Sequence, residues 1–288
     1  SKVLSYIALV SALTIMLHDY MPSFEALMAI VASIMVVSIA TAYYRRFEHR
    51  VHSVYGALAW SSGLFLVYYL TRYAVYQGGT FALLYTIYLV LGVSSIAVVA
   101  AKSYGVALQN VNPRYALLGA VLGIVTGWFV MAIPLNVVPL IGATVSSLAS
   151  FGATVSAFDV SVATFIVMLY LVAVPEEMLG RVFGFHVGAI ALSPSCASVA
   201  SVILGYALHA ITRYPDFGSL IIVTVVWSLV TAFYASTRSL IGAVLFHATY
   251  NTVVVVASIY GVFNVFIASL PIVLAVAVYV LTGGGSDG

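Results

Sequence analysis

The sequence predicts an all-α polytopic membrane protein with about ten transmembrane helices, as its composition, the length of its apolar runs and its charge placement indicate. Of the 288 residues, 64% are hydrophobic and 6% are charged, whereas soluble domains carry roughly 25% charged residues. The mean hydropathy is +1.16, and the apolar surface that this value implies cannot all be buried in one core, because too few charged side chains exist to form a water-facing surface around it. The chain therefore uses lipid as its solvent.

Composition also excludes several functional classes. The net charge is +2 and no basic tract exists, so nucleic acid is not expected as a partner. The single cysteine, Cys196, excludes an internal disulfide and a thiolate metal cluster.

The apolar runs define the predicted helices. They are close to the ~20 residues that a ~30 Å hydrocarbon layer requires. The stretch 140–158 is rich in Ser, Thr, Ala and Gly, and it is predicted to be re-entrant or interfacial rather than a full span. The predicted spans are 3–17, 24–44, 52–71, 80–101, 115–133, 160–190, 196–212, 219–235, 239–258 and 261–281.

Charge placement predicts the orientation of a multi-pass protein of the cell membrane. Three arginines fill the loop at 45–50, and Lys102 and Arg114 occupy the loop two spans later. The side between them holds only Arg72, and 134–158 carries no charge. Basic loops stay on the cytoplasmic side. The N-terminus is therefore expected to be cytoplasmic, and the whole chain, 1–288, is expected to form one integral membrane domain.

Six ionisable side chains fall inside the predicted C-terminal helices. An ionisable group at the middle of a bilayer costs at least ~2.5–3.5 kcal/mol, so each is a candidate for a functional role. They are Glu176, Glu177, Arg181, His186, His209 and His247.

The segment from Pro175 to Arg181 concentrates three of these groups. Glu177 and Arg181 are four residues apart in the favourable acid-first order, which predicts an ion pair on one helix face. Glu176 points about 100° away, so the pair leaves it without a partner. Pro175 is expected to kink the helix where the acids begin, and Gly180 opens space beside them.

A second group of polar side chains lies on the helices that follow. His247 and Asn251, at i and i+4, project from one face of a single helix. Each alone is explained equally well as interhelical hydrogen bonding, and His209 alone as a buried structural histidine. Counted at 1.5 Å per residue, however, Glu176, His209, His247 and Asn251 lie at depths that agree within about one helical turn. They are therefore expected to meet in one cavity in the cytoplasmic half of the membrane.

The order and spacing of these residues resemble the CPBP family, which contains the type II CAAX prenyl endopeptidases and the Abi proteins and is regarded as a family of intramembrane glutamic proteases. Its motifs are Glu-Glu-x-x-x-Arg, a later helix with His, and a later His-x-x-x-Asn or His-x-x-x-Asp helix. The segment 176–181 fits the first and 247–251 fits the third. The resemblance covers 160–258, which is expected to form a catalytic bundle in the C-terminal half, with accessory helices in 1–139.

Two positions depart from the family pattern. The second motif usually reads Phe-x-x-x-His, and Gly205 stands at its aromatic position before His209. Gly180 stands where an aromatic residue usually precedes Arg181. These departures bear on the shape of the substrate groove more than on the chemistry.

The resemblance implies a role for each site residue. Glu176 and His209 would activate water, while His247 and Asn251 would line the opposite side of the site near the developing oxyanion. No cofactor is expected, and the expected partner is a membrane-associated protein or peptide, with CAAX-like prenylated proteins as the family's best-known substrates. A carboxylate whose pKa is raised by burial can act as a base near neutral pH.

Three other interpretations remain open. Glu176, His209 and His247 are acceptable zinc ligands, so a zinc protease using the same residues is possible. Buried Glu and His in broken helices also mark proton-coupled transporters, although no inverted repeat is visible. A protease-like scaffold that binds partners without cleaving them is the third. Ser193, Ser195 and Cys196 lie near a loop without a buried Asp, which argues against a serine or cysteine protease.

Overall fold

In the computed structural model, every described element is a helix. The described residues are 57, 60–61, 63–68, 82–106, 112–132, 162–213 and 217–282. The elements are α4 (Ala82–Ser103), α5 (Pro113–Ala132), α7 (Val162–Glu177), η3 (Met178–Phe185), α8 (His186–Ala191), η4 (Pro194–Cys196), α9 (Ala197–Arg213), α10 (Phe217–Thr237), α11 (Leu240–Tyr260) and α12 (Val262–Thr282).

These helices follow the apolar runs of the sequence. From 80–101 onward, each predicted run except 160–190 coincides with one helix, and the ends agree to within two residues. The run 160–190 comprises three consecutive elements, α7, η3 and α8. The predicted segments 3–17, 24–44 and 140–158 lie outside the described residues, and 52–71 is described only in part.

Four of the described helices are long and apolar enough to cross a bilayer. They contain the windows Thr86–Ser103, Pro113–Ala132, Leu240–Tyr260 and Val262–Val280. Alpha-helices satisfy all their backbone hydrogen bonds internally, which is what a lipid environment requires. The described part of the chain is therefore all-helical and contains several apolar helices of membrane-spanning length.

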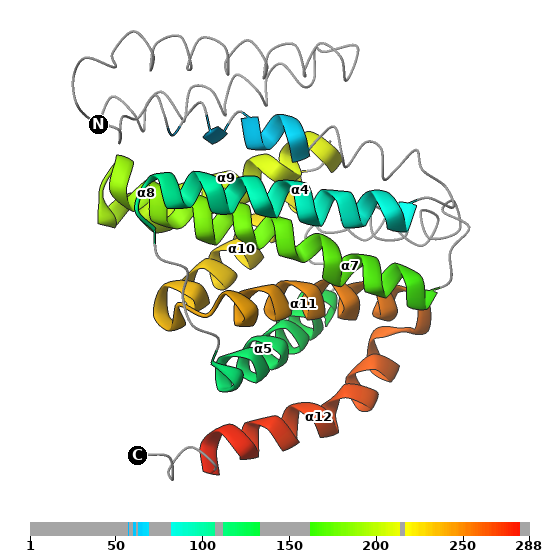
Figure 1. Cartoon of the computed structure of the whole chain (residues 1–288). Helices are drawn as coiled ribbons and strands as arrows, with labels where there is room; N and C mark the ends of the chain where they lie inside the picture. The colour runs from blue at the N-terminus through cyan, green and yellow to red at the C-terminus, as the bar shows by residue number, and fades with distance from the viewer. Residues whose placement is uncertain are drawn as a thin grey trace, which may run out of the picture.

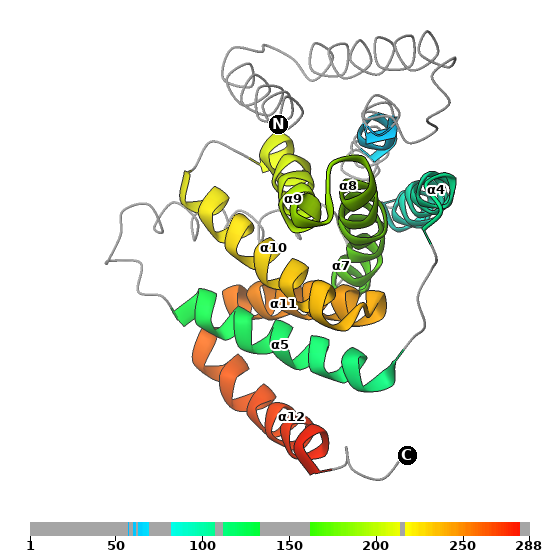
Figure 2. The ribbon, with the colours of Figure 1, turned by 90° about the vertical axis from the view of Figure 1, so that its left-hand side faces the viewer.

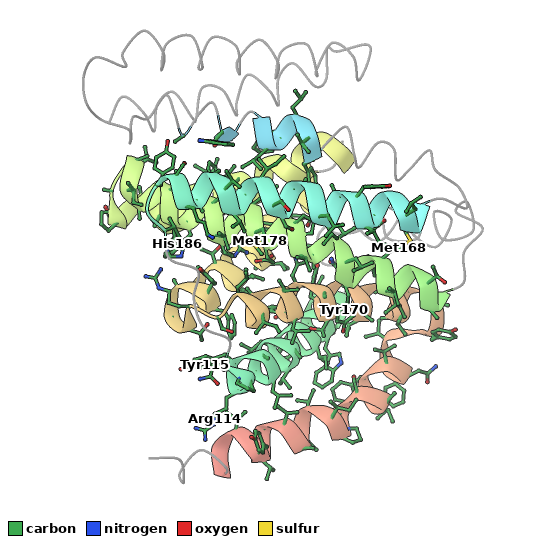
Figure 3. All side chains as sticks on the ribbon, viewed as in Figure 1. Arg114, Tyr115, Met168, Tyr170, Met178 and His186 are labelled. Carbon is green, nitrogen blue, oxygen red and sulfur yellow. The ribbon has the colours of Figure 1, made fainter. Side chains whose placement is uncertain are left out.

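The element that carries the two glutamates is irregular. Pro175 lies inside α7, and the next eight residues, Met178–Phe185, form a π-helix rather than a continuation of the α-helix. Proline lacks the backbone N–H that would close the preceding α-helical turn, and π-helical turns are frequent at functional sites. Helices α7, η3 and α8 follow one another without a gap and are called the long helix below. The labelled side chains of Met168, Met178 and His186 mark its course (Figure 3).

The helices pack in a crossed arrangement. Helix α4 runs alongside α7 and η3 in both views, whereas α10, α11 and α5 cross below them (Figures 1 and 2). Helix α5 lies between α11 and α12 in both views, and α12 is peripheral. The long helix is thus enclosed by α4 on one side and by α9, α10 and α11 on others.

Helix α11 is fixed along its length by α5. Three glycines of α5, Gly119, Gly123 and Gly127, face α11, and a Cβ atom at Gly119 or Gly123 would overlap the α11 backbone. A Cβ at Gly127 would lie 2.6 Å from the Val253 side chain. Small residues at such spacing allow two membrane helices to approach closely. The helix that carries His247 is therefore held against a neighbour at backbone distance.

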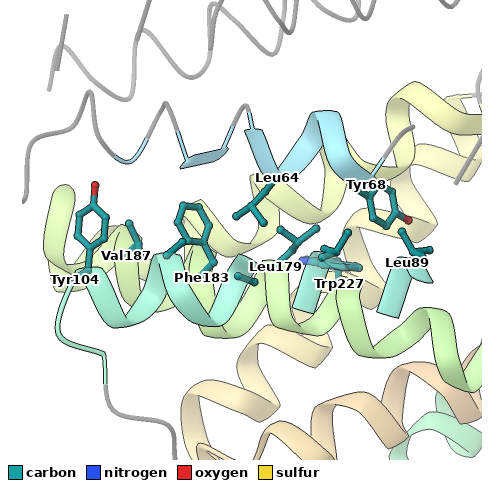
Figure 4. Close-up of a cluster of buried hydrophobic side chains, with 11 residues drawn as sticks. Leu64, Tyr68, Leu89, Tyr104, Leu179, Phe183, Val187 and Trp227 are labelled. Carbon is teal, nitrogen blue, oxygen red and sulfur yellow. The ribbon is translucent and has the colours of Figure 1, made fainter. Parts of the chain in front are cut away.

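A buried hydrophobic cluster joins the first half of the chain to the long helix. Leu179, Phe183 and Val187 form one row on the long helix, and Figure 4 shows Leu64 beside Leu179 and Tyr104 at the other end of the row, near Val187. Helix α4 contributes a matching stripe, and Trp227 reaches the same cluster from α10. The stripe comprises Leu89, Val93, Ala97, Ala100 and, just beyond α4, Tyr104.

Candidate active site

The candidate site lies where the end of α7 and the start of η3 meet α11. Glu176 and Glu177 are the last residues of α7, and Arg181 is in the first turn of η3. His247 lies in the first half of α11, and the side chain of Ser239, the N-cap of this helix, accepts a hydrogen bond from the Gly242 backbone N–H. Apolar helices surround these ionisable groups, and all four are buried.

The His247 imidazole lies between the two adjacent carboxylates. Its Nδ1 is 2.8 Å from Glu177 Oε1, a hydrogen bond. Its Nε2 is 3.6 Å from Glu176 Oε2, which is too long for a hydrogen bond but close for opposite charges. The two carboxylates contact different nitrogens of one ring, because an imidazole presents its two nitrogens in different directions. The Glu177–Arg181 pair was expected to leave Glu176 without a partner, whereas Glu176 lies near this ring.

Glu177 also forms the predicted ion pair with Arg181. Arg181 Nε lies 3.0 Å from Glu177 Oε2, and neither side chain is exposed to solvent. The contact angle falls outside hydrogen-bond geometry, so the two groups are paired by charge rather than by an aligned hydrogen bond. Glu177 therefore has two charged or chargeable partners, Arg181 from its own helix and His247 from α11.

Ser201 of α9 anchors the Arg181 guanidinium to the neighbouring helix. Arg181 Nη1 donates to Ser201 Oγ at 3.0 Å, and Ser201 Oγ donates to the Gly180 carbonyl at 2.7 Å. Thr231 Oγ1 lies 3.4 Å from the same hydroxyl. Arg181 Nη2 has no hydrogen-bond partner among the described residues. The buried guanidinium is thus held through Nε and Nη1.

Tyr68 brings the first half of the chain into the site. Its phenolic hydroxyl donates a hydrogen bond to Glu176 Oε1, and both groups are buried. An ionised carboxylate has no hydrogen to donate, so the phenol supplies the hydrogen of this bond. Glu176 therefore has a hydrogen-bond donor on one oxygen and His247 near the other.

Trp227 of α10 packs against both glycines at which the motifs depart from the family pattern. A Cβ at Gly180 would lie 2.8 Å from the indole Cζ2, and a Cβ at Gly205 would overlap the indole ring. The ring also lies against Arg181 and His247, with distances of 4.5 Å from the Arg181 Cζ and 5.6 Å between the ring centroids. The space left by the two glycines is filled by an aromatic side chain from another helix.

The other two predicted site residues have different outcomes. Asn251 lies one turn after His247 on α11, is partly buried, and makes no side-chain hydrogen bond to other described residues. His209 belongs to α9, but its side chain lies outside the described part of the chain. His186 is apart from the cluster and hydrogen-bonds Tyr234 through Nε2 at 2.8 Å.

Four residues of the site were missed by sequence reasoning. Tyr68, Ser201, Trp227 and Thr231 are ordinary residues of apolar helices, and nothing in their spacing relates them to Glu176 or Arg181. One signal was available for Trp227, because two glycines in charged or histidine-bearing motifs imply a large side chain nearby.

The donors that could hold a metal ion are few in the described part of the site. Among the side chains that the structure describes, no group of three or more His, Cys, Asp or Glu residues is arranged for a metal ion. The zinc interpretation needs His209 together with Glu176 and His247, so it depends on a side chain outside that set.

Comparison with known proteins gives one match. Residues 158–253 match the family model described as "Type II CAAX prenyl endopeptidase Rce1-like". No curated protein and no solved structure matches the chain. The matched segment contains every predicted site residue, whereas Tyr68 lies outside it.

Proposed function

We propose that this chain is a metal-independent intramembrane endopeptidase, because residues 158–253 match the family model described as "Type II CAAX prenyl endopeptidase Rce1-like", a family of peptidases. The observation that carries the proposal is the His247 imidazole between two adjacent buried carboxylates. A cluster of this kind is costly in an apolar bundle and is a functional candidate by default.

The two glutamates have different surroundings, which supports Glu176 as the base. Glu177 is engaged by the Arg181 guanidinium and the His247 Nδ1. Glu176 accepts a hydrogen bond from the Tyr68 hydroxyl through Oε1, and its Oε2 lies 3.6 Å from the His247 Nε2, too far for a hydrogen bond to that imidazole. That oxygen is therefore the carboxylate atom best suited to accept a proton from water.

Charge balance supports His247 as the oxyanion donor. Two carboxylates and one guanidinium leave one negative charge, and a protonated His247 neutralises it. A buried cluster with no net charge costs far less than one with an unpaired charge. In this state Nδ1–H donates to Glu177, while Nε2–H is available to a substrate oxygen.

The proposed reaction is peptide hydrolysis in two steps. Glu176 takes a proton from water, and the resulting hydroxide attacks the carbonyl carbon, whose oxygen becomes negatively charged. His247 and Asn251 donate hydrogen bonds to that oxygen, each worth about 3–4 kcal/mol by analogy with other oxyanion holes. Glu176 then returns the proton to the amide nitrogen as the C–N bond breaks, releasing an acid and an amine.

Helix register supports a place for His209 in this reaction. Ser201 and Gly205 lie one turn apart on the face of α9 that contacts η3 and Trp227. Position 209 is one further turn along the same face. As the resemblance implies, His209 would assist Glu176 in orienting the water.

The proposed substrate is a membrane-associated protein or peptide with a C-terminal segment to be removed, such as a CAAX-like prenylated protein. The family supplies this substrate class. The helices around the site expose large apolar side chains on their outer faces, among them Val167, Leu229 and Ile241, which supports a lipid-linked substrate that reaches the protein from the bilayer.

Cleavage of a fluorogenic prenylated peptide by the full chain in detergent tests the proposal. We expect Glu176→Gln to abolish cleavage, because the amide keeps the shape of the carboxylate but cannot accept the proton. Asn264→Ala is the control for Asn251→Ala, since Asn264 is exposed on α12 and its amide donates only to the Tyr260 carbonyl. Asn251→Ala should leave slow cleavage, and Asn264→Ala should leave it unchanged.

The same assay separates the alternatives. Excess chelator should have no effect, whereas inhibition that zinc reverses would replace the proposal with a zinc protease. Absence of cleavage for every peptide, together with substrate-dependent proton flux in liposomes, would overturn the protease and favour a transporter.

A further inference from the structure

Trp227 contacts three elements of the candidate site at once. Its side chain is 3% exposed and lies against η3, α9 and α11. We propose that Trp227 is a positioning residue, which sets the spacing of these three helices and so aligns the groups that act on the substrate. This inference rests on the proposed peptidase function.

The contact with η3 involves the Arg181 charge. The guanidinium carbon lies 4.5 Å from the indole centroid, a cation–π arrangement. Arg181 Nη2 has no hydrogen-bond partner among the described residues, and the other contacts of the guanidinium are made through Nε and Nη1. The ring therefore supplies a further electrostatic partner to the guanidinium. Because Arg181 pairs with Glu177, the position of the indole bears on the carboxylate that holds His247.

The contact with α11 involves His247 directly. The indole and imidazole centroids are 5.6 Å apart and the rings are inclined at 78°, an edge-to-face pair. Such pairs favour one relative orientation of the two rings. The imidazole orientation is thus fixed from one side by Trp227 and from another by the Glu177 carboxylate.

The contact with α9 extends over one helical turn. The indole Nε1–H donates to the Ser201 carbonyl at 2.8 Å, and the ring occupies the space beside Gly205. Both contacts lie on one face of the helix, four residues apart. They fix the height and the distance of α9 relative to α10, and position 209 follows one turn later on that face.

A buried side chain with these contacts affects turnover rather than substrate binding. The contacts of Trp227 are made to protein groups, since its N–H donates to the Ser201 carbonyl and its ring packs on Arg181 and His247, so it acts through these groups. A small displacement of aligned reacting groups lowers the rate by up to about 100-fold. Replacing Trp227 should therefore reduce kcat and leave KM unchanged.

The first experiment compares Trp227→Phe with Trp128→Phe in the full chain. Trp128 is a matched control, since its Nε1 donates to Ser269 Oγ at 3.0 Å and its ring packs edge-to-face on Phe266, remote from the site. We expect kcat for peptide cleavage to fall about 10-fold to 100-fold in Trp227→Phe only, with KM unchanged. Equal kcat values for both variants would overturn the inference.

The second experiment moves the aromatic group from α10 to α9. Gly205→Phe alone should lower the melting temperature, because its side chain collides with the indole. Combining it with Trp227→Gly should restore the melting temperature above that of either single variant and recover part of kcat. Additive losses in the double variant would show that the two positions do not share one space, and would overturn the inference.

The two proposals fail in different ways. A wild-type protein that cleaves no peptide contradicts the peptidase function. In that case the melting temperatures of Gly205→Phe, Trp227→Gly and the double variant still decide whether Trp227 sets the spacing of the helices. A cleaving wild type with an unaffected Trp227→Phe contradicts the positioning role alone.

Discussion

At the scale of single residues, the two neighbouring glutamates differ in their partners. Glu177 is engaged by Arg181 and by the His247 Nδ1, while Glu176 is engaged by the Tyr68 hydroxyl and lies near the His247 Nε2. The Glu177–Arg181 pair was predictable because i and i+4 positions meet within one helix. The Tyr68 contact was not, because it joins residues 108 positions apart and neither helix carries a pattern that specifies the other.

Tyr68→Phe tests the role of the phenol. We expect kcat to fall about tenfold or more, because a hydrogen bond to a charged group contributes roughly 1.5–3 kcal/mol and here it orients the Glu176 carboxylate. Steady-state cleavage kinetics provide the measurement, and KM should not change. Tyr260→Phe is the control, as that ring is exposed. A kcat equal to that of the control would contradict the role.

Arg181→Ala tests the buried ion pair. The substitution leaves the Glu177 carboxylate with one ionic partner fewer in an apolar interior, and we expect a loss of about 3–5 kcal/mol in the free energy of unfolding. Thermal unfolding in detergent measures it, with Lys102→Ala as the control because Lys102 is exposed at the end of α4. Unchanged yield and melting temperature would show that the pair contributes no stability.

At the scale of elements, helix positions follow from composition, but contacts between helices do not. Runs of apolar residues gave the bounds of α4, α5 and α9 to α12 closely, because lipid selects length and hydrophobicity. The π-helical turns of Met178–Phe185 were not predicted, since Pro175 indicates a break without specifying its geometry. The close packing of α5 on α11 also depends on a partner that the sequence of α5 alone does not identify.

Gly123→Ala tests that packing. A Cβ at Gly123 would collide with the Phe246 carbonyl and the Thr249 side chain, so α11 must shift. We expect a loss of about 1–3 kcal/mol in the free energy of unfolding. Gly92→Ala in α4 is the matched control, because nothing lies within 4 Å of its Cβ, and it should be neutral or gain up to about 1 kcal/mol. Equal melting temperatures would contradict the packing role.

At the scale of the whole molecule, the described helices of both halves form one packed body around the candidate site. Helix α4 packs on α7 and η3, and Leu64 and Tyr68 join the same hydrophobic cluster. The resemblance placed the site within 160–258, because sequence motifs record catalytic groups. It gave no indication that the first half supplies a contact to Glu176, since hydrogen bonds from a distant helix leave no periodic signal.

The single cysteine tests the predicted orientation. Cys196 is partly exposed in the short turn between α8 and α9, at the end of the molecule that the charge distribution assigns to the cytoplasm. A membrane-impermeant maleimide should label it in inverted membrane vesicles and not in intact cells. Cys196→Ser controls for nonspecific labelling. Labelling in intact cells but not in inverted vesicles would show that the orientation is opposite to the predicted one.

The hydrogen bond from Tyr68 to Glu176 has a consequence for biosynthesis. The contacts around Glu176 come from positions 68, 176 and 247, so they span most of the chain. The chain is synthesised from its N-terminus, so the early helices are in the bilayer before the last helices have been made. The cluster cannot assemble until α11 has been inserted. A ribosome-bound intermediate would therefore lack the assembled cluster, and the proposed cleavage activity would begin only when synthesis of the protein is nearly complete.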